Sequence, residues 1–406
     1  AGSNMSKAQR REASPTVDKR RRTHENDHRG TDVTSPSQLR EDEDGHYVFR
    51  YGDLIHSRFS CVNLMGAGTF GKVVECYDKR TGYILAIKVI RNKAKYRSAA
   101  RTEIEILKRL KESDPDHQSC CIRLQSWVDV SGHYCLIFKK RGPSVFDVLK
   151  SNRYRPFRLV DVQQIMQQLL TAVAWIHRME LIHTDLKPEN ILYKRDKMVD
   201  VDVPSMGRIR IPETNEIELI DFGSTVYQRN VHSSVVSTRH YRAPEVVLGL
   251  GWSYPCDMWS VGCILCELYC GETLFQTHDN LEHLCMMERL LGPLPRHMTS
   301  TNGPHMDRRD YRDLFHSNGE LRLDEASSNT RRAVGRMSKL RHIFTLDEPS
   351  QLCFDLASRL LDLDLARRPD AAEALRHPFF KLRIRENHLP PPAPSHATHR
   401  RTSGRD

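Results

Sequence analysis

Ten residues, HTDLKPENIL from His183 to Leu192, constrain the function of this chain more than any other stretch. They place an aspartate, a lysine and an asparagine at close spacing, at Asp185, Lys187 and Asn190. The aspartate can accept the proton of an attacking hydroxyl, the lysine can neutralise a moving phosphate, and the asparagine can hold a metal ion that bridges nucleotide phosphates. The stretch therefore predicts phosphoryl transfer from ATP. A plain loop between two helices is the alternative, because short polar strings recur by chance.

A glycine-rich stretch, GAGTFGKV from Gly66 to Val73, lies upstream between two runs that alternate like strands. Its glycines, Gly66, Gly68 and Gly71, would let the backbone of a hairpin lie close over phosphates. The same pattern could open a dinucleotide-binding unit, but that unit needs a helix directly after the glycines. Here two β-rich runs follow, VVECYD and YILAIKVI. We therefore predict a hairpin that covers phosphates.

The run YILAIKVI contains Lys88 among apolar neighbours. A buried lysine is costly unless it is paired, and the helical segment RSAARTEIEILKRLKES offers a carboxylate. We predict that Glu103 pairs with Lys88, so that the lysine can hold the α- and β-phosphates of ATP. Glu105 is the competitor, on another side of the helix.

The run HYCLIFKKRG is typical of a strand that leads into a linker. Phe138 would end the strand at the back of an adenine pocket, and residues 139–142 would form a hinge whose backbone binds adenine. Asp147, after the hinge, could bind the ribose. The residues predicted to contact ATP are Gly66, Gly68, Gly71, Val73, Ala86, Lys88, Phe138, Lys139, Arg141, Asp147 and Leu192.

The triplet Asp221-Phe222-Gly223 follows a predicted strand, 36 residues beyond Asp185. In this position Asp221 is expected to bind Mg²⁺ together with Asn190, and Phe222 is expected to pack beneath the helix that carries Glu103. Between HTDLKPENIL and this strand, MVDVDVP and GRIRIP indicate an inserted hairpin.

A stretch rich in serine, threonine and tyrosine comes next and closes in Ala243-Pro244-Glu245. We interpret it as an activation segment. Its residues Thr238, Arg242 and Glu245 are the candidates for structural contacts. We predict that Thr238 bonds Asp185 and Lys187, and that Glu245 pairs with Arg368.

The net charge of +10 is concentrated at the two ends of the chain, which together supply +8. The composition of residues 1–46 predicts a disordered basic tail, and that of residues 387–406 a disordered Pro/Arg-rich tail. The run Lys19-Arg20-Arg21-Arg22 could serve nuclear import or touch RNA or DNA. The body of the chain is nearly balanced in charge, so we do not expect it to bind nucleic acid directly.

Neither a membrane span nor a metal site made by cysteines is expected. No stretch approaches 18 uninterrupted apolar residues, as a membrane helix requires, and the start lacks a signal-peptide pattern, which favours an intracellular protein. Cys263 and Cys266 form a CxxC pair that could be half of a zinc site. However, their run SVGCILCELYC has the pattern of a buried helix, so we predict neither a metal nor a redox role.

Taken in order, these motifs resemble those of eukaryotic protein kinases over residues Phe59 to Phe380. The stretch EHLCMMER, from Glu282 to Arg289, closely resembles the EHLAMMER signature of the LAMMER, or Cdc-like, kinases, with Cys285 in place of alanine. STRHYRAPEV and the inserted hairpin agree with this family as well.

The resemblance implies an α+β, bilobal protein kinase fold within residues 47–386. The N-lobe, about 47–138, would be a small, mostly antiparallel β-sheet with one key helix. The hinge would be 139–142, and the mainly helical C-lobe 143–386. The implied catalytic residues are Asp185, Lys187, Asn190, Lys88, Glu103 and Asp221.

The resemblance also implies transfer of the ATP γ-phosphate to serine and threonine of Arg-Ser-rich nuclear proteins such as splicing factors, with Mg²⁺ as the metal. Glu189 and Asp147 would bind substrate arginines. Tyrosine activity is left open. We expect a monomer in the nucleus, with the cytoplasm as a second location. The alternatives are nuclear substrates such as chromosome-segregation proteins, or a pseudokinase scaffold.

Three features depart from the usual kinase pattern. In this family an acidic residue usually follows the gatekeeper position, whereas here Phe138 is followed by Lys139, Lys140 and Arg141. The insert Thr299–Ile343 is divergent. Thr184 replaces the arginine that in many kinases binds a phosphorylated activation segment. We therefore predict activity without phosphorylation of that segment.

Overall fold

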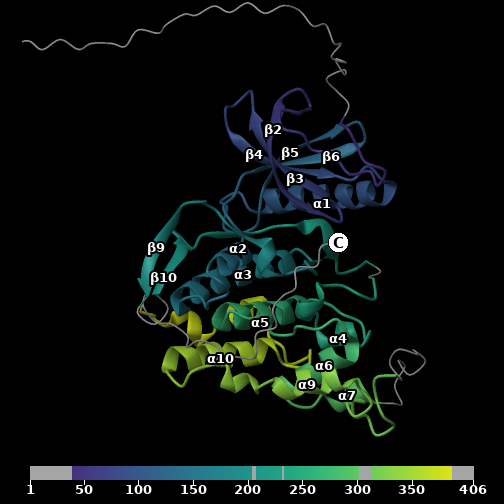
Figure 1. Ribbon diagram of the computed structural model, residues 1–406, viewed down its shortest axis with the longest axis vertical. Helices are drawn as coiled ribbons and strands as arrows, with labels where there is room; N and C mark the ends of the chain where they lie inside the picture. The colour runs from purple at the N-terminus through teal and green to yellow at the C-terminus, as the bar shows by residue number, and fades with distance from the viewer. Residues whose placement is uncertain (1–38, 204–206, 231–232, 301–312, 386–406) are drawn as a thin grey trace, which may run out of the picture. The chain divides into compact units, whose positions relative to one another are not determined.

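The computed structural model describes residues 39–203, 207–230, 233–300 and 313–385 (Figure 1). The predicted C-terminal tail, most of the N-terminal tail with its Lys19–Arg22 run, and part of the divergent insert lie outside the described residues. Within the described part, a β-sheet with one long helix precedes a mainly helical region in the chain. The two-part α+β organisation expected from the sequence is confirmed.

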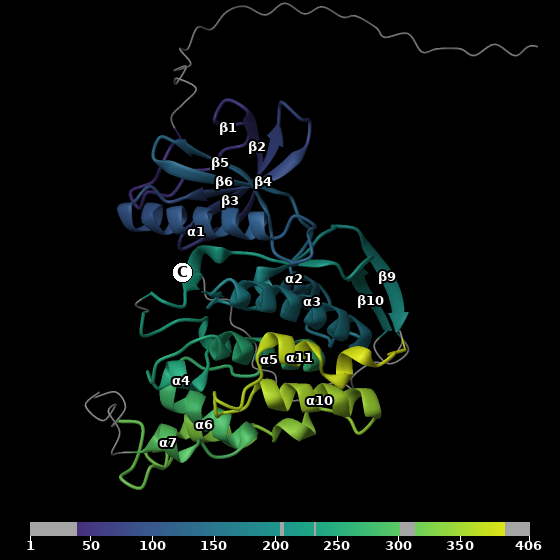
Figure 2. The ribbon, with the colours of Figure 1, turned by 180° about the vertical axis from the view of Figure 1, so that it is seen from behind.

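The N-lobe is a six-stranded antiparallel sheet in the order β1-β2-β3-β4-β6-β5. Helix α1 packs against strands β4, β5 and β6 (Figures 1 and 2). The elements are β1 Leu54–Ile55, β2 Phe59–Gly68, β3 Gly71–Asp78, β4 Ile84–Ile90, α1 Ala94–Ser113, β5 Leu124–Val130 and β6 His133–Lys139.

The alternation of strand β4 decides which face of the sheet each of its side chains reaches. Ile87 and Val89 are buried in a core with Phe59 and Tyr47. Lys88, between them, points to the opposite face, where it meets α1. The strand thus supports one core and also delivers a charged side chain to the second face.

The N-lobe includes residues upstream of its predicted start at residue 47. Residues 39–46, assigned from the sequence to a disordered tail, pack along the N-lobe: Leu39 lies against the core that contains Tyr47, and Glu41 forms a β-bridge with Tyr47. The guanidinium of Arg91 donates to the backbone O of Asp44, at 3.0 Å from Nε and 2.7 Å from Nη2. The acidic composition concealed this, because these residues are held mainly through backbone groups.

The C-lobe is built around α5, which is buried on all sides and packs against α3 and α10. Cys263 and Cys266 lie inside this helix as core residues. The helices are α2 Val145–Ser151, α3 Leu159–Arg178, α4 Pro244–Val247, α5 Pro255–Cys270, α6 Asn280–Leu291, α7 Arg296–Thr299, α9 Ser328–Arg336, α10 Glu348–Leu360 and α11 Ala371–Leu375.

Short strands and 3₁₀ turns lie in the connections between these helices. The strand pairs are β7 with β12, β8 with β11, and β9 with β10, all antiparallel. Their bounds are β7 Leu181–Ile182, β8 Ile191–Tyr193, β9 Met198–Val203, β10 Gly207–Pro212, β11 Ile217–Leu219 and β12 Val226–Tyr227. The 3₁₀ turns are η1 Pro188–Asn190, η2 Phe222–Ser224, η3 Arg239–Tyr241, η4 Leu340–His342 and η5 Pro378–Lys381.

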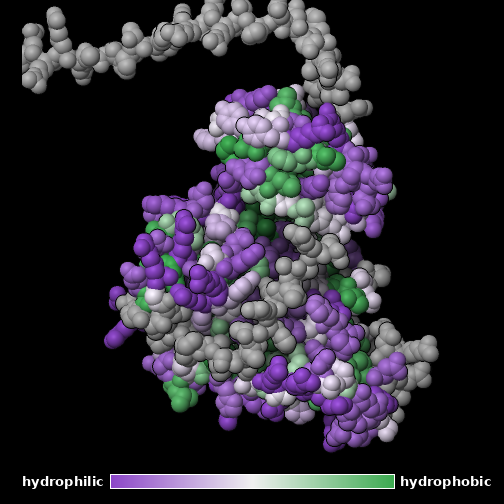
Figure 3. All heavy atoms as spheres, viewed as in Figure 1, coloured by the Kyte–Doolittle hydropathy of each residue, from purple (hydrophilic) through white to green (hydrophobic). Residues whose placement is uncertain are grey.

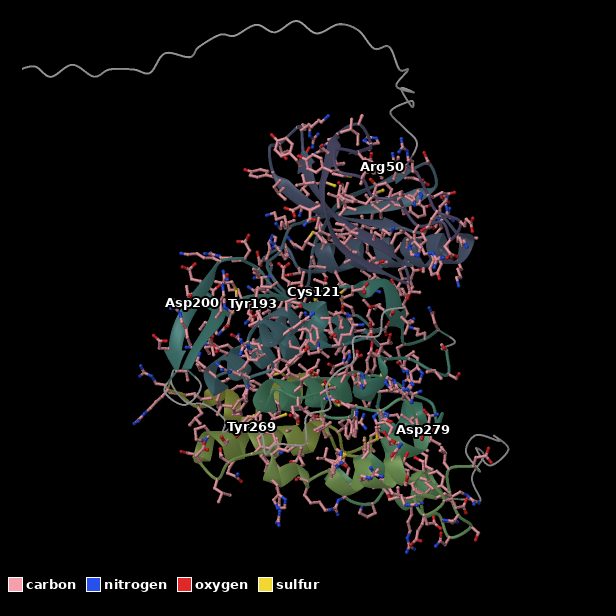
Figure 4. The ribbon with its side chains drawn as sticks, viewed as in Figure 1. Arg50, Cys121, Tyr193, Asp200, Tyr269 and Asp279 are labelled. Atoms are coloured by element: carbon pink, nitrogen blue, oxygen red, sulfur yellow. The ribbon has the colours of Figure 1, made fainter. Side chains whose placement is uncertain are left out.

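The predicted inserted hairpin is confirmed as β9 and β10, the strand pair that carries the labelled Asp200 (Figure 4). It has a small core of its own, made by Val203, Ile209 and Ile211. The end of α2 anchors it, because the side chain of Asn152 bonds both the backbone N and the backbone O of Arg210.

Hydrophobic residues gather over the N-lobe sheet on the face shown in Figure 3, whereas hydrophilic residues cover most of the rest of the described surface there. The exposed large hydrophobic residues of this lobe are Tyr51, Val62, Leu64, Met65, Tyr77, Tyr83, Ile84 and Trp127. Among the described residues, no helix combines the length and apolar character needed to span a bilayer.

Candidate active site

The loop between β7 and β8 is fixed from below by Asp257, which lies in the first turn of α5. Its buried carboxylate accepts hydrogen bonds from the backbone N of His183 at 2.8 Å and of Thr184 at 2.9 Å. It also bonds His177 at 2.9 Å. Burial would raise the pKa of Asp257, but the His177 contact and the backbone donors lower it below 3.8. Asp257 is thus a charged anchor that sets the path of the loop.

The loop brings together the three predicted catalytic residues that it carries, Asp185, Lys187 and Asn190. Lys187 Nζ lies 2.6 Å from Asp185 Oδ2. Asn190 donates from Nδ2 to the backbone O of Asp185 at 2.8 Å, so its Oδ1 is the atom suited to bind a metal. Thr238 Oγ1 donates to Asp185 Oδ1 at 2.6 Å and accepts from Lys187 Nζ at 3.1 Å, as predicted.

Lys88 bridges the two lobes. Its Nζ lies 2.7 Å from Glu103 Oε1 and 2.8 Å from Asp221 Oδ1. Burial would lower the pKa of Lys88, but the two carboxylates outweigh it and raise the pKa. The predicted choice of Glu103 over Glu105 is confirmed: Glu103 is buried and Glu105 is exposed.

Asp221 directly precedes η2 and has a left-handed backbone conformation, with φ 62°. Such strain is typical of residues whose position matters for function. Burial raises and Lys88 lowers the pKa of Asp221, with a net decrease. Phe222 is buried and contacts the ring of His183 edge-on at 5.4 Å, and η2 packs against α1 as predicted.

The glycine-rich stretch forms the predicted hairpin, with Gly68 opposite Gly71 at the turn between β2 and β3. A Cβ at Gly71 would lie 2.1 Å from the backbone O of Val89, so only glycine fits there. By contrast, a Cβ at Gly66 or Gly68 would meet nothing within 4 Å. The hairpin is therefore tight against β4 at one glycine and open at the other two.

The remaining predicted adenine contacts lie on neighbouring strands. Val73 pairs with Lys88, and Ala86 pairs with Phe138. Leu192 lies in β8, opposite Glu218.

The hinge differs from the prediction by one residue. Lys139 pairs with Leu85 as the last residue of β6, so the linker is 140–142. Arg141, predicted to contact ATP, directs its side chain to Glu218, which leaves only its backbone for adenine.

Asp147 has a structural task that the sequence analysis did not assign. Its Oδ2 accepts from the backbone N of Ser144 at 2.9 Å and from Ser144 Oγ at 2.7 Å, and Ser144 Oγ accepts from the backbone N of Asp147. This is a capping box at the start of α2, and the spacing S-x-x-D was the signal that could have revealed it. Asp147 is exposed to solvent.

The end of the activation segment is held by the predicted pair of Glu245 and Arg368, at 2.8 and 3.1 Å, both buried. Arg242 donates to the backbone O atoms of Val236 and Ser237. Glu189, the second candidate for substrate arginines, is exposed one residue before Asn190. Two ion pairs at the hinge, made by Lys140 and by Arg141, were missed, although a glutamate inside the apolar strand IEL was a signal for a buried partner.

Comparison with known proteins agrees with this geometry. The protein kinase domain family matches residues 59–380. Serine/threonine-protein kinase AFC1 of Arabidopsis thaliana is 45% identical over 370 residues, which cover 88% of this chain and 78% of that protein. Dual specificity protein kinase CLK4 of Mus musculus is 44% identical, over 85% of this chain and 70% of that protein. The chain belongs to the LAMMER, or Cdc-like, family of protein kinases.

The fold of this kinase has a solved counterpart. The crystal structure of a kinase domain superimposes with a TM-score of 0.76 and 34% sequence identity, covering 84% of this chain and all of that one. The predicted bilobal fold is therefore confirmed, and the enzyme is an ATP-dependent protein kinase. The site residues described above are of the types that this chemistry uses: a carboxylate that could act as a base, cations for phosphates and oxygen donors for a divalent metal.

Proposed function

We propose that this kinase transfers the γ-phosphate of ATP to serine and threonine in Arg-Ser-rich nuclear proteins, splicing factors being the model substrates. The observation that carries the proposal is the placement of Glu189. It is an exposed carboxylate that directly precedes the buried metal-ligand candidate Asn190 and faces no basic partner among the described residues. A substrate arginine could form a charge-assisted hydrogen bond there.

Asp147 supports the same preference more weakly. Both of its side-chain bonds to Ser144 end on Oδ2, which leaves the Oδ1 atom of this exposed carboxylate for a guanidinium or for the ribose of ATP. Together, the carboxylates of Asp147, after the hinge, and of Glu189, in the catalytic loop, favour a basic peptide. Proteins involved in chromosome segregation are the alternative substrates, and they are separated from splicing factors by whether arginine is required.

Magnesium is the proposed metal. The free Oδ1 of Asn190 and the Oδ2 of Asp221, whose Oδ1 is held by Lys88, form the oxygen donor set that Mg²⁺ prefers. The ion would neutralise charge on the ATP phosphates. The chain's own residues then act on the acceptor: Asp185 receives the hydroxyl proton of serine, while Lys187 stabilises the phosphate that is transferred.

We further propose that the enzyme acts as a monomer in the nucleus, with the cytoplasm as a second location. The basic run at Lys19–Arg22 supports nuclear import by its composition alone. A fluorescent fusion with and without this run would test the location, and analytical ultracentrifugation would test the monomer.

The test of the substrate proposal uses Mg-ATP and two peptides, an Arg-Ser repeat and its copy with every arginine replaced by alanine. We expect fast labelling of the Arg-Ser peptide alone. Asp185→Asn is the catalytic control and should lower kcat by roughly 10²–10⁴-fold, as loss of a general base does. Glu189→Gln should raise KM for the Arg-Ser peptide and leave KM for ATP unchanged. Equal labelling of both peptides would disprove the arginine preference and leave the kinase activity standing.

A further inference from the structure

Two consecutive cations of the hinge reach carboxylates in different lobes. Lys140 Nζ lies 2.8 Å from Glu75 Oε1 in β3 of the N-lobe. Arg141 forks onto Glu218 in β11 of the C-lobe, with Nε 2.6 Å from Oε2 and Nη2 2.7 Å from Oε1. One short linker is thus tied by its side chains to both of the bodies that it connects.

The two ion pairs differ in burial. The side chains of Arg141 and Glu218 are 17% and 7% exposed, and those of Lys140 and Glu75 are 33% and 15% exposed. A bidentate guanidinium-carboxylate pair that is largely shielded from water is strong and geometrically specific. The more exposed lysine pair contributes less. The Arg141 pair is therefore the main fixed point of the hinge.

Strand β11 connects the Arg141–Glu218 ion pair to other parts of the site. Cys121 forms a parallel β-bridge with Leu219, while Tyr193 of β8 pairs with Ile217, so β11 lies between segments marked by these two labelled residues (Figure 4). Glu218 is the central residue of β11, and Asp221 follows it by three residues. Arg141 therefore connects the adenine end of the site to the strand that delivers the metal-binding carboxylate.

The backbone secures the other end of the hinge. Gly142 donates from its backbone N to the O of Tyr193 at 2.8 Å. A Cβ at Gly142 would lie 2.0 Å from the backbone O of Arg195, so the chain passes this point at the closest approach that glycine allows. Between Lys139, the last residue of β6, and Gly142, only residues 140 and 141 lie outside these backbone contacts, and the two ion pairs hold both of them.

We propose that Arg141, assisted by Lys140, is a positioning residue for ATP. The two ion pairs fix the path of the hinge backbone, whose amide and carbonyl groups bond adenine, relative to Asp221 at the phosphate end. The substitution of basic residues for the usual hinge sequence is therefore a device that sets affinity for the nucleotide. Loss of the Arg141 pair loosens the adenine subsite and leaves the catalytic loop and the peptide-binding carboxylates in place.

The experiment compares steady-state kinetics of the full chain with Arg141→Leu, Glu218→Leu and the charge-reversed double variant Arg141→Glu/Glu218→Arg. We expect each single variant to raise KM for ATP by roughly tenfold, within the range of coupling between contacting residues. KM for the peptide should stay unchanged, and kcat should fall less than KM rises. The charge-reversed double variant should recover most of the lost ATP affinity. Lys140→Met should give a smaller change in the same direction.

The matched control is Arg58→Leu. Arg58 also forks onto a buried carboxylate, Asp78, with both contacts at 2.6 Å, but at the ends of β2 and β3 that lie away from the glycine-rich turn. This variant should lower thermal stability and leave KM for ATP unchanged. An unchanged KM for ATP in folded Arg141→Leu, or an equal rise in Arg58→Leu, would overturn the proposal.

A variant with a conservative change covers the case in which Arg141→Leu does not fold. Arg141→Lys keeps the charge but cannot fork onto both oxygens of Glu218. It should show an intermediate KM for ATP, and a wild-type KM there would overturn the positioning role. Because every variant is compared on the same peptide, a failure of the Arg-Ser preference would not affect this result.

Discussion

His283 is fully buried in α6, within the LAMMER signature, and neither of its ring nitrogens has a hydrogen-bond partner among the described residues. Its ring packs against Phe275 at 5.2 Å. Arg239, Arg242 and His240 of the activation segment are the titratable groups that act on it. Burial, and then these neighbours, lower the pKa of His283 to about 3. The histidine is therefore neutral in the folded protein.

This environment predicts a loss of stability in mild acid. Between the folded pKa of about 3 and the unfolded pKa of about 6.5 the unfolded chain binds one more proton, so stability falls as pH drops below about 6.5. Between pH 7 and pH 5 we expect the free energy of unfolding to fall by about 2 kcal/mol from this residue alone. Urea titrations of the wild type and His283→Leu at both pH values measure it.

The control for this prediction is His342→Leu, because His342 is an exposed histidine of the same lobe. It should show the wild-type pH dependence, whereas His283→Leu should lose about 2 kcal/mol less than wild type between pH 7 and pH 5. An identical pH dependence in wild type and His283→Leu would show that His283 is not the responsible group.

Residues whose partners the chemistry dictates were predictable from the sequence. Lys88 needed a carboxylate, and the helical segment that follows it offered Glu103, with Glu105 as the competitor. Asp147 was less predictable, since an exposed carboxylate after the hinge suits a ribose, a substrate arginine and a helix cap equally well. Arg141 was assigned to ATP because its partner Glu218 is 77 residues away, and only the folded chain brings them together.

At the scale of elements, residues 39–49 form a strap along the N-lobe. The strap contacts the segment that leads from β4 into α1: Gly45 O accepts from the backbone N of Asn92 at 2.8 Å, and Asp44 O accepts from Arg91. Because α1 carries Glu103, the strap holds the start of the helix that positions Lys88. The sequence did not reveal the strap, since the acidic run EDED has the composition of a disordered tail.

Gly45 tests this strap. It has φ +74°, and a Cβ there would lie 3.2 Å from Asn92 O. Gly52 has a similar φ of +82°, but a Cβ would meet nothing within 4 Å. Both Gly→Ala changes should cost the left-handed backbone penalty of about 1–2 kcal/mol. Only Gly45→Ala should also press the strap away from α1.

Thermal melts and kinase assays on these two variants separate the effects. We expect Gly45→Ala to lower the melting temperature more than Gly52→Ala and to reduce kcat, because the support of the Glu103 helix is disturbed. Equal melting temperatures and equal kcat values for the two variants would mean that the strap has no influence on α1.

On the scale of the whole molecule, the arrangement of the site is held by bonds between the lobes and at the two ends of the activation segment. Thr184 Oγ1 donates to the backbone O of Ser224 at 2.9 Å and so joins the catalytic loop to η2. Lys88 joins α1 to Asp221, and Arg368 holds Glu245 at the end of the segment. Unmodified side chains and backbone groups make all of these bonds.

The residues and the resemblance to kinases were sufficient to predict the two lobes and the contacts of Lys88 with Glu103 and of Thr238 with Asp185, because these follow from chemistry that ATP requires. They could not predict how the hinge is braced or where the strap lies. Those features depend on residues such as Glu218 and Gly45, whose roles come from long-range register and close backbone approach. These positions are chemically unremarkable until the chain is folded.

Thr184 bears on how the enzyme is activated. In many kinases an arginine beside the catalytic aspartate needs a phosphorylated residue to fix the activation segment. Here Thr184 takes that place and bonds Ser224 O directly, so the catalytic loop and η2 are joined without a phosphate. We expect phosphatase-treated protein, checked by mass spectrometry, to retain most of its kcat.

Thr184→Val keeps the shape and removes the hydroxyl, so it should lower kcat. Thr171→Val removes an exposed hydroxyl on α3 and should leave kcat unchanged. A dephosphorylated protein that is inactive and recovers only after treatment with another kinase would contradict this account.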